Sequence, residues 1–87
     1  MYKVKTSKIF EKFLKRQDKD FQKRVSAAID TISVDPYNNN LDIKPLIDEE
    51  NCYRLRIGKF RILYEIQKDL ILIYFYKADS RGDIYKK

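Results

Sequence analysis

Residues 52–66 constrain the fold of this chain more than any other stretch. Polar and apolar residues alternate on both sides of Gly58-Lys59, which is typical of a β-hairpin, and glycine at the first central position suits a two-residue type II′ turn. A turn of that length places Ile57 opposite Phe60 and Arg56 opposite Arg61. One face of the hairpin is then apolar and predicts a core beneath it. Its residues are Tyr53, Leu55, Ile57, Phe60, Ile62, Tyr64 and Ile66.

The opposite face of the hairpin gathers Arg54, Arg56 and Arg61. Like charges directly across a strand pair are destabilising, so folding alone does not favour this arrangement. Guanidinium groups bind phosphate through parallel hydrogen bonds and keep their charge. The face therefore has two interpretations, which are an anion-binding surface and the solvated outer face of an antiparallel sheet.

Length and charge narrow the class of protein. A chain of 87 residues predicts a single domain, spanning residues 1–87, with a small core. The net charge of +6 is unevenly distributed. Residues 1–50 carry ten Lys/Arg against nine Asp/Glu, whereas residues 51–87 carry nine against four. The basic excess thus accompanies the hairpin and indicates a nucleic acid or an acidic protein as partner.

The counts of cysteine and histidine and the length of the apolar runs argue against disulfide-bonded, metal-binding and membrane-spanning proteins. The single cysteine cannot form an internal disulfide, which favours a reducing cytoplasm. One cysteine and no histidine argue against a metal site, and no cofactor is expected. The N-terminus does not have the pattern of a signal peptide. The longest apolar run, Leu70 to Tyr76, is far shorter than the ~20 residues that span a bilayer, so no membrane contact is expected.

Periodicity predicts the remaining elements. Thr6 or Ser7 is the expected cap of a first helix, and Asp18 or Asp20 that of a second, which ends at Asp35-Pro36. The two helices are expected to form an antiparallel pair. The predicted order is an edge strand at residues 2–5, a helix with its apolar stripe at 9–14, a helix with its stripe at 21–32, a connection at 37–50, the hairpin, and a buried strand at 70–76.

The last predicted strand adds aromatic residues to the arginine side. With Lys68-Asp69 as the turn, Ile71, Ile73 and Phe75 join the core, while Tyr74 and Tyr76 join the arginines. Tyr76 is then expected opposite Arg61. Aromatic rings among cations are typical of a stacking platform for unpaired bases, although tyrosine is also an ordinary strand former.

The predicted order β-α-α-β-β-β, the stretch at 53–66 and the closing Arg81-Gly82-Asp83-Ile84-Tyr85 together resemble the RelE/ParE superfamily of toxins from type II toxin–antitoxin systems. The resemblance covers nearly the whole chain. It implies an α+β fold in which two N-terminal helices pack on a small twisted antiparallel sheet. It also implies an acidic antitoxin that wraps the toxin in a hetero-oligomeric complex.

The RelE branch implies a ribosome-dependent endoribonuclease, in which a 2′-hydroxyl attacks the neighbouring phosphate of mRNA and leaves a 2′,3′-cyclic phosphate. The resemblance assigns catalytic roles to Arg54, Arg56, Arg61, Arg81 and Tyr85. The expected RNA contacts are Arg54, Arg56, Lys59, Tyr74 and Tyr76.

Two departures from the better-known pattern concern proton transfer. Arginines replace lysines on the first hairpin strand, and no histidine is present. Because arginine stays protonated, the first candidate for the general base is Tyr85, provided that the surrounding cations lower its pKa from about 10, and Glu65 is a weaker candidate. Two alternatives stay open, which are a ParE-like toxin that acts on DNA gyrase and a weak family member that binds only RNA or its antitoxin.

Overall fold

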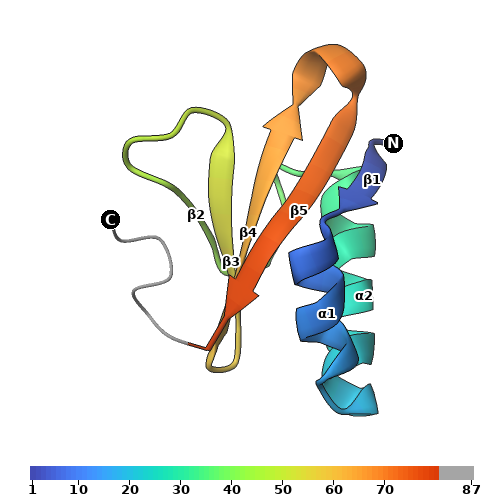
Figure 1. Cartoon of the computed structure of the whole chain (residues 1–87). Helices are drawn as coiled ribbons and strands as arrows, with labels where there is room; N and C mark the ends of the chain where they lie inside the picture. The colour runs from blue at the N-terminus through green and yellow to red at the C-terminus, as the bar shows by residue number, and fades with distance from the viewer. Residues whose placement is uncertain (81–87) are drawn as a thin grey trace.

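The computed structural model describes residues 1–80 of the chain. Figure 1 shows a twisted sheet with both helices on one side of it. The elements are β1 (Lys3–Thr6), α1 (Lys8–Lys15), α2 (Lys19–Val34), β2 (Ile43–Pro45), β3 (Cys52–Ile57), β4 (Phe60–Gln67), the 3₁₀ turn η1 (Lys68–Leu70) and β5 (Leu72–Asp79). The predicted α+β class and the order of the helices and main strands are confirmed.

The sheet has the order β1-β5-β4-β3-β2. β1 lies at one edge and runs parallel to β5, and every other pair is antiparallel. The sheet is therefore mixed, whereas the sequence predicted a purely antiparallel sheet. The connection at 37–50 also contains β2, because Leu41 and Ile43 both pack against the core and hold this segment alongside β3.

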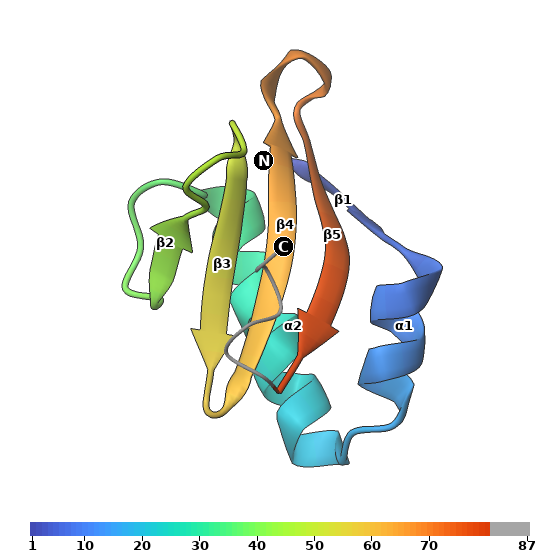
Figure 2. The same ribbon diagram turned by 60° about the vertical axis from the view of Figure 1, so that its left-hand side comes forward.

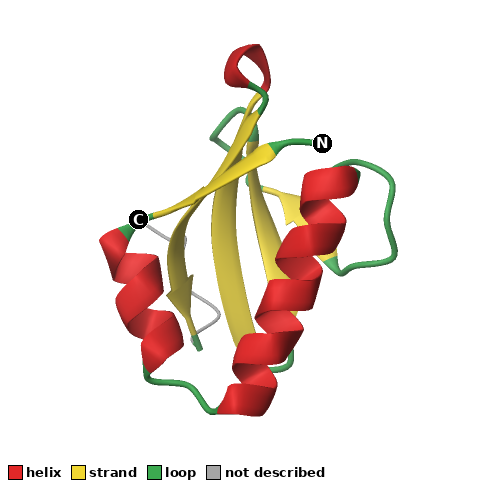
Figure 3. Cartoon of the chain, turned by 90° about the vertical axis from the view of Figure 1, so that its right-hand side faces the viewer, coloured by secondary structure: helices red, strands yellow, loops and turns green. Residues whose placement is uncertain are grey.

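Both helices begin at predicted caps. The Ser7 hydroxyl accepts a hydrogen bond from the Phe10 N–H at 3.0 Å, and the Asp18 carboxylate accepts one from the Phe21 N–H at 2.8 Å. α2 ends at Val34, and its C-cap, Asp35, is the residue before Pro36. The helices run in opposite directions over the same face of the sheet and diverge along their length (Figure 3).

The core lies between the helices and the sheet. α1 and α2 contribute Phe10, Phe21, Val25, Ala28 and Ile32, and the strands contribute Leu55, Ile57, Ile62, Tyr64, Ile66, Ile73 and Phe75. All of these side chains are buried. Because the core occupies one face of the sheet, every second residue of β3 and β4 is directed to the other face.

The register of the hairpin matches the prediction. Ile57 pairs with Phe60, Arg56 with Arg61, and Arg54 with Leu63. Gly58 has a φ of 59° and Lys59 does not have a positive φ, as a type II′ turn requires. The alternating pattern and the short turn were sufficient to determine this pairing.

The prediction for the last strand was wrong in its start and its register. The turn continues through η1, and Ile71 adopts a left-handed conformation with a φ of 50°. Ile71 is consequently 56% exposed instead of lying in the core. A β-bulge where β5 passes Leu63 and Tyr64 leaves Tyr76 without a partner in the β4–β5 register. The longer turn and the bulge together place Asp79, not Tyr76, opposite Arg61.

Candidate functional site

The face of the sheet away from the helices carries the predicted site, and it is called the arginine face here. Figure 2 shows it toward the viewer, with α2 behind the strands. The strand registers place on it the basic residues Lys3, Lys5, Lys44, Arg54, Arg56, Arg61 and Lys77, and the acidic residues Glu65 and Asp79. Asp42, in the segment just before β2, adds a third carboxylate beside Arg54. Seven cations against three carboxylates still make this surface basic, as an anion-binding surface requires.

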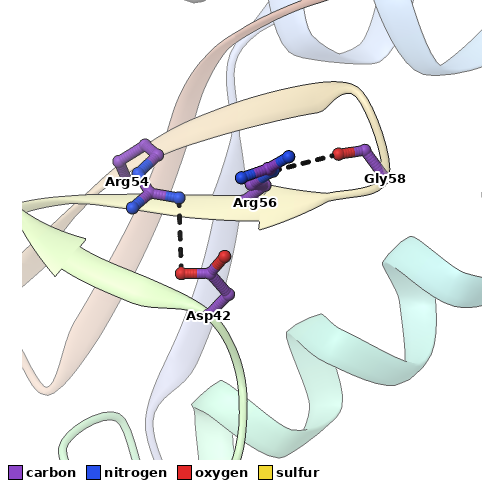
Figure 4. Close-up of polar contacts among 4 residues, drawn as sticks. All are labelled: Asp42, Arg54, Arg56 and Gly58. Carbon is purple, nitrogen blue, oxygen red and sulfur yellow. Dashed lines mark hydrogen bonds and ion pairs between the residues drawn. The ribbon is translucent and has the colours of Figure 1, made fainter.

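Arg54 is the most enclosed charged residue of the arginine face. It is 7% exposed, and among residues 1–80 it is the one charged residue that is buried. Its Nη1 lies 3.5 Å from Asp42 Oδ1, in an ion pair between β3 and the segment that leads into β2 (Figure 4). Arg54 also sits between Lys44 on β2 and Leu63 on β4. A buried guanidinium with a carboxylate partner is a fixed charge, since leaving either group alone would be costly.

Arg56 and Arg61 face each other across the hairpin, one on each strand. Arg56 is exposed, and its Nε donates a hydrogen bond to the carbonyl oxygen of Gly58 at 3.2 Å (Figure 4). Arg61 is half-buried, and Asp79 is its neighbour on β5. The structure thus brings Arg54, Arg56 and Arg61 together on one face, as predicted, and adds a carboxylate beside the last of them.

Lys59 lies apart from the arginine face. It occupies the turn between β3 and β4, and its Nζ is 5.6 Å from the centre of the Phe60 ring. A cleft of about 400 Å³ opens nearby, between this turn and the start of α2. Its lining includes Asp18 and Asp20 as well as Arg24 and Lys59, so its charge is mixed.

Tyr74 and Tyr76 extend the arginine face with aromatic surface. Their ring centres are 6.1 Å apart, and both side chains are half-buried. Tyr74 lies beside Glu65 on β4, and the Tyr76 phenol lies near the Cys52 side chain. Burial, and then the proximity of Cys52, raise the pKa of Tyr76 well above its ordinary value. The phenol therefore remains protonated at neutral pH.

Three chemically relevant residues were missed by the sequence analysis, namely Asp42, Lys44 and Lys77. Asp42 and Lys44 alternate with Leu41 and Ile43, both of which pack against the core, and this alternation was the available signal. Lys77 lies on the arginine face because of the bulge, and no local sequence pattern predicts that bulge. Arg81 and Tyr85 lie outside the described residues.

Within residues 1–80, no three His, Cys, Asp or Glu side chains come together in a way that could hold a metal ion. No helix in the described part of the chain is long and apolar enough to cross a membrane.

Comparison with known proteins agrees with this architecture. A relative in Methanocaldococcus jannaschii, Toxin RelE3, is 34% identical over 85 residues, which cover 95% of this chain and 94% of the relative. The toxin of the archaeal RelE–RelB complex from Pyrococcus horikoshii OT3 superposes with a TM-score of 0.82 at 26% identity, covering 93% of this chain and 96% of that one. The RelB–RelE antitoxin–toxin complex from Methanococcus jannaschii gives 0.76 at 32% identity, covering 95% and 96%.

The family model described as the ParE toxin of the type II toxin–antitoxin system parDE matches residues 4–83. This match spans both helices and all the strands except the first residue of β1. The chain therefore belongs to the ParE toxin family of type II toxin–antitoxin systems, within the RelE/ParE superfamily.

Proposed function

We propose that this toxin inhibits translation by cutting mRNA in the ribosomal A site. The observation that carries the proposal is the arginine face, where three arginines and two tyrosines share one side of the sheet. Like charges in register, as at Arg56 and Arg61, destabilise a strand pair and are best explained by a polyanion that binds over them. RNA is such a polyanion, and tyrosine rings can stack on its unpaired bases.

The proposed reaction is attack of a ribose 2′-hydroxyl on the neighbouring phosphorus. The P–O bond to the 5′-oxygen of the next nucleotide breaks, leaving a 2′,3′-cyclic phosphate and a 5′-hydroxyl. Negative charge on the phosphoryl oxygens grows in the transition state, and Arg54, Arg56 and Arg61 stabilise it. In this proposal Arg81 stabilises the leaving oxygen, and Tyr85 stacks on or orients the base.

Proton transfer needs a group that can accept a proton at neutral pH. Arginine cannot do so, and Tyr76 stays protonated because burial raises its pKa. Tyr76 is thus suited to donate a hydrogen bond. Glu65, between Cys52 on β3 and Tyr74 on β5, is one proposed acceptor. Tyr85 is the other, on the condition that the surrounding cations favour its phenolate form. An enzyme of this kind depends mainly on how the ribosome positions the codon.

An antitoxin is the second proposed partner. The Pyrococcus horikoshii and Methanococcus jannaschii structures are RelE–RelB complexes. A chain with a net charge of +6 suits an acidic antitoxin that wraps it in a hetero-oligomeric complex. The proposed setting for both partners is the cytoplasm, where the ribosome and mRNA are found.

Mapping of 5′ ends in a reconstituted translation system, with and without ribosomes, tests the main proposal. Cuts within A-site codons that appear only with ribosomes would support it. Intact mRNA under both conditions would refute it.

The matching family description, the ParE toxin of parDE, favours a second candidate, which is inhibition of DNA gyrase by protein–protein contact. A supercoiling assay with purified gyrase tests this directly. A gyrase inhibitor is expected to keep its activity when Arg61 is replaced by alanine, whereas an endoribonuclease is expected to lose it.

A further inference from the structure

We infer that Asp42 is a positioning residue, which holds the Arg54 guanidinium in place for binding the phosphate that is cleaved. This inference rests on the proposed endoribonuclease function and goes beyond it, since it assigns a role to a residue outside the hairpin. The first observation is the ion pair itself, in which Arg54 Nη1 lies 3.5 Å from Asp42 Oδ1 (Figure 4). In the described part of the chain it is the one ion pair within 4 Å.

The second observation is that the backbone of Asp42 is fixed. Its carbonyl oxygen accepts a hydrogen bond from the Arg56 N–H at 2.9 Å, at the point where β2 begins to pair with β3. Leu41 and Ile43, on either side, pack against the core. Because side chains alternate in an extended segment, the Asp42 carboxylate is directed to the arginine face. Asp42 thus contacts Arg56 through its backbone and Arg54 through its side chain.

The third observation is the difference in exposure between the two partners. The Arg54 side chain is 9% exposed, whereas that of Asp42 is 52% exposed. A long, flexible side chain loses much rotational freedom when it is buried, and Asp42 supplies a charged partner that favours one orientation. The carboxylate itself stays hydrated. This arrangement fits a support for Arg54 better than a group that reacts with RNA directly.

The geometry predicts that Asp42→Asn lowers the cleavage rate without lowering the affinity for RNA. Removing a negative charge from the arginine face should leave the affinity for RNA unchanged or raise it. Loss of the ion pair should lower kcat about tenfold, by analogy with the outer contacts that orient metal ligands, whose loss costs roughly 10–100-fold in activity. A variant that failed to fold would instead lose both RNA affinity and cleavage. If Asp42 acted only through its charge on the affinity for RNA, its removal would not lower kcat.

Asp48→Asn is the matched control, because it makes the same change of charge at an exposed position six residues along the same connection. The assay is single-turnover cleavage of a ribosome-bound message, together with equilibrium binding of a fluorescent single-stranded RNA. Asp48→Asn is expected to retain the cleavage rate of the original chain. Equal losses of kcat in the two variants, or an unchanged kcat in Asp42→Asn, would overturn the inference.

A second measurement separates this inference from the proposed function. Nitrogen-15 NMR of the free protein reports how fast the Arg54 guanidinium group rotates. Rotation is expected to be slow in the original chain and in Asp48→Asn, and several-fold faster in Asp42→Asn. Slow rotation in all three proteins would refute the role of Asp42 even if mRNA is cut. If rotation is fast only in Asp42→Asn and the original chain cuts no RNA, the two conclusions separate. The ion pair is then supported as the constraint on Arg54, and the endoribonuclease function is refuted.

Discussion

Tyr64 gives the sharpest prediction about stability. Its side chain is fully buried, and its hydroxyl has no hydrogen-bond partner among the described residues. The ring packs on Tyr53 and Phe75, with ring centres 5.7 and 5.0 Å away. Phenylalanine would keep these ring contacts and remove the hydroxyl. An unsatisfied buried polar group costs about 1–3 kcal/mol, so we expect Tyr64→Phe to raise the free energy of unfolding by about 1 kcal/mol.

Thermal and urea denaturation followed by circular dichroism measure this change. For a domain of this size, about 1 kcal/mol corresponds to a rise in Tm of roughly 4–8 °C. Tyr74→Phe is the control, since Tyr74 is half-buried on the opposite face and water can reach it. That change should stay within about 0.5 kcal/mol. Destabilisation of Tyr64→Phe by 1 kcal/mol or more would refute the reasoning, because it would mean that the hydroxyl makes a favourable hydrogen bond.

The same hydroxyl predicts the response to alkaline pH. Burial raises the pKa of Tyr64 above its ordinary value of 10.0. A group whose pKa is raised on folding contributes stability that is fully present below the pKa of the unfolded chain and lost as pH rises toward the folded pKa. The free energy of unfolding should therefore fall above pH 10, and less steeply in Tyr64→Phe. Equal slopes for the two proteins would show that Tyr64 does not contribute.

Three other predictions concern the site and the hairpin. Arg61→Ala and Tyr85→Ala should keep the circular dichroism spectrum and lose most toxicity; loss of the folded spectrum would exclude them as site residues. Affinity for single-stranded RNA should fall steeply with salt, with a slope in log–log form of about −0.7 for each phosphate contact, and a salt-insensitive affinity would contradict binding by the arginine face. Gly58→Ala should lower the free energy of unfolding by at least about 1 kcal/mol, because a φ of 59° is strained for any residue with a side chain. The new Cβ would have space, since the nearest atom, Arg24 Nη1, would be 4.0 Å away. Unchanged urea denaturation would contradict this prediction.

The resemblance seen in the sequence led to the right superfamily because its most specific residues are local. The hairpin at 53–66 combines a period-two pattern with a glycine turn, and the pairing of Arg56 with Arg61 follows from those two features alone. The caps at Ser7 and Asp18 were also local signals, since each side chain bonds to a backbone N–H three residues along. The catalytic roles assigned to the arginines stay predictions, as does the whole role of Arg81 and Tyr85.

Other features depended on contacts between distant segments. The parallel pairing of β1 with β5 joins residues about seventy positions apart, and no periodicity specifies such a partner. The residue opposite Arg61 depended on the length of the turn after β4 and on one bulge in β5, each of which moves every later pair. The predicted partner, Tyr76, was wrong for this reason.

The sequence by itself determined that three arginines share one face of a hairpin, because an apolar face opposite them must be buried and side chains alternate along a strand. Only the tertiary structure decided which of those arginines is buried and what holds it. Arg54 pairs with Asp42 because Leu41 and Ile43 pack into a core built from both helices, and that packing brings the connection at 37–50 alongside β3. Local patterns specify the direction of a side chain, whereas its partners are set by how the whole chain buries its apolar surface.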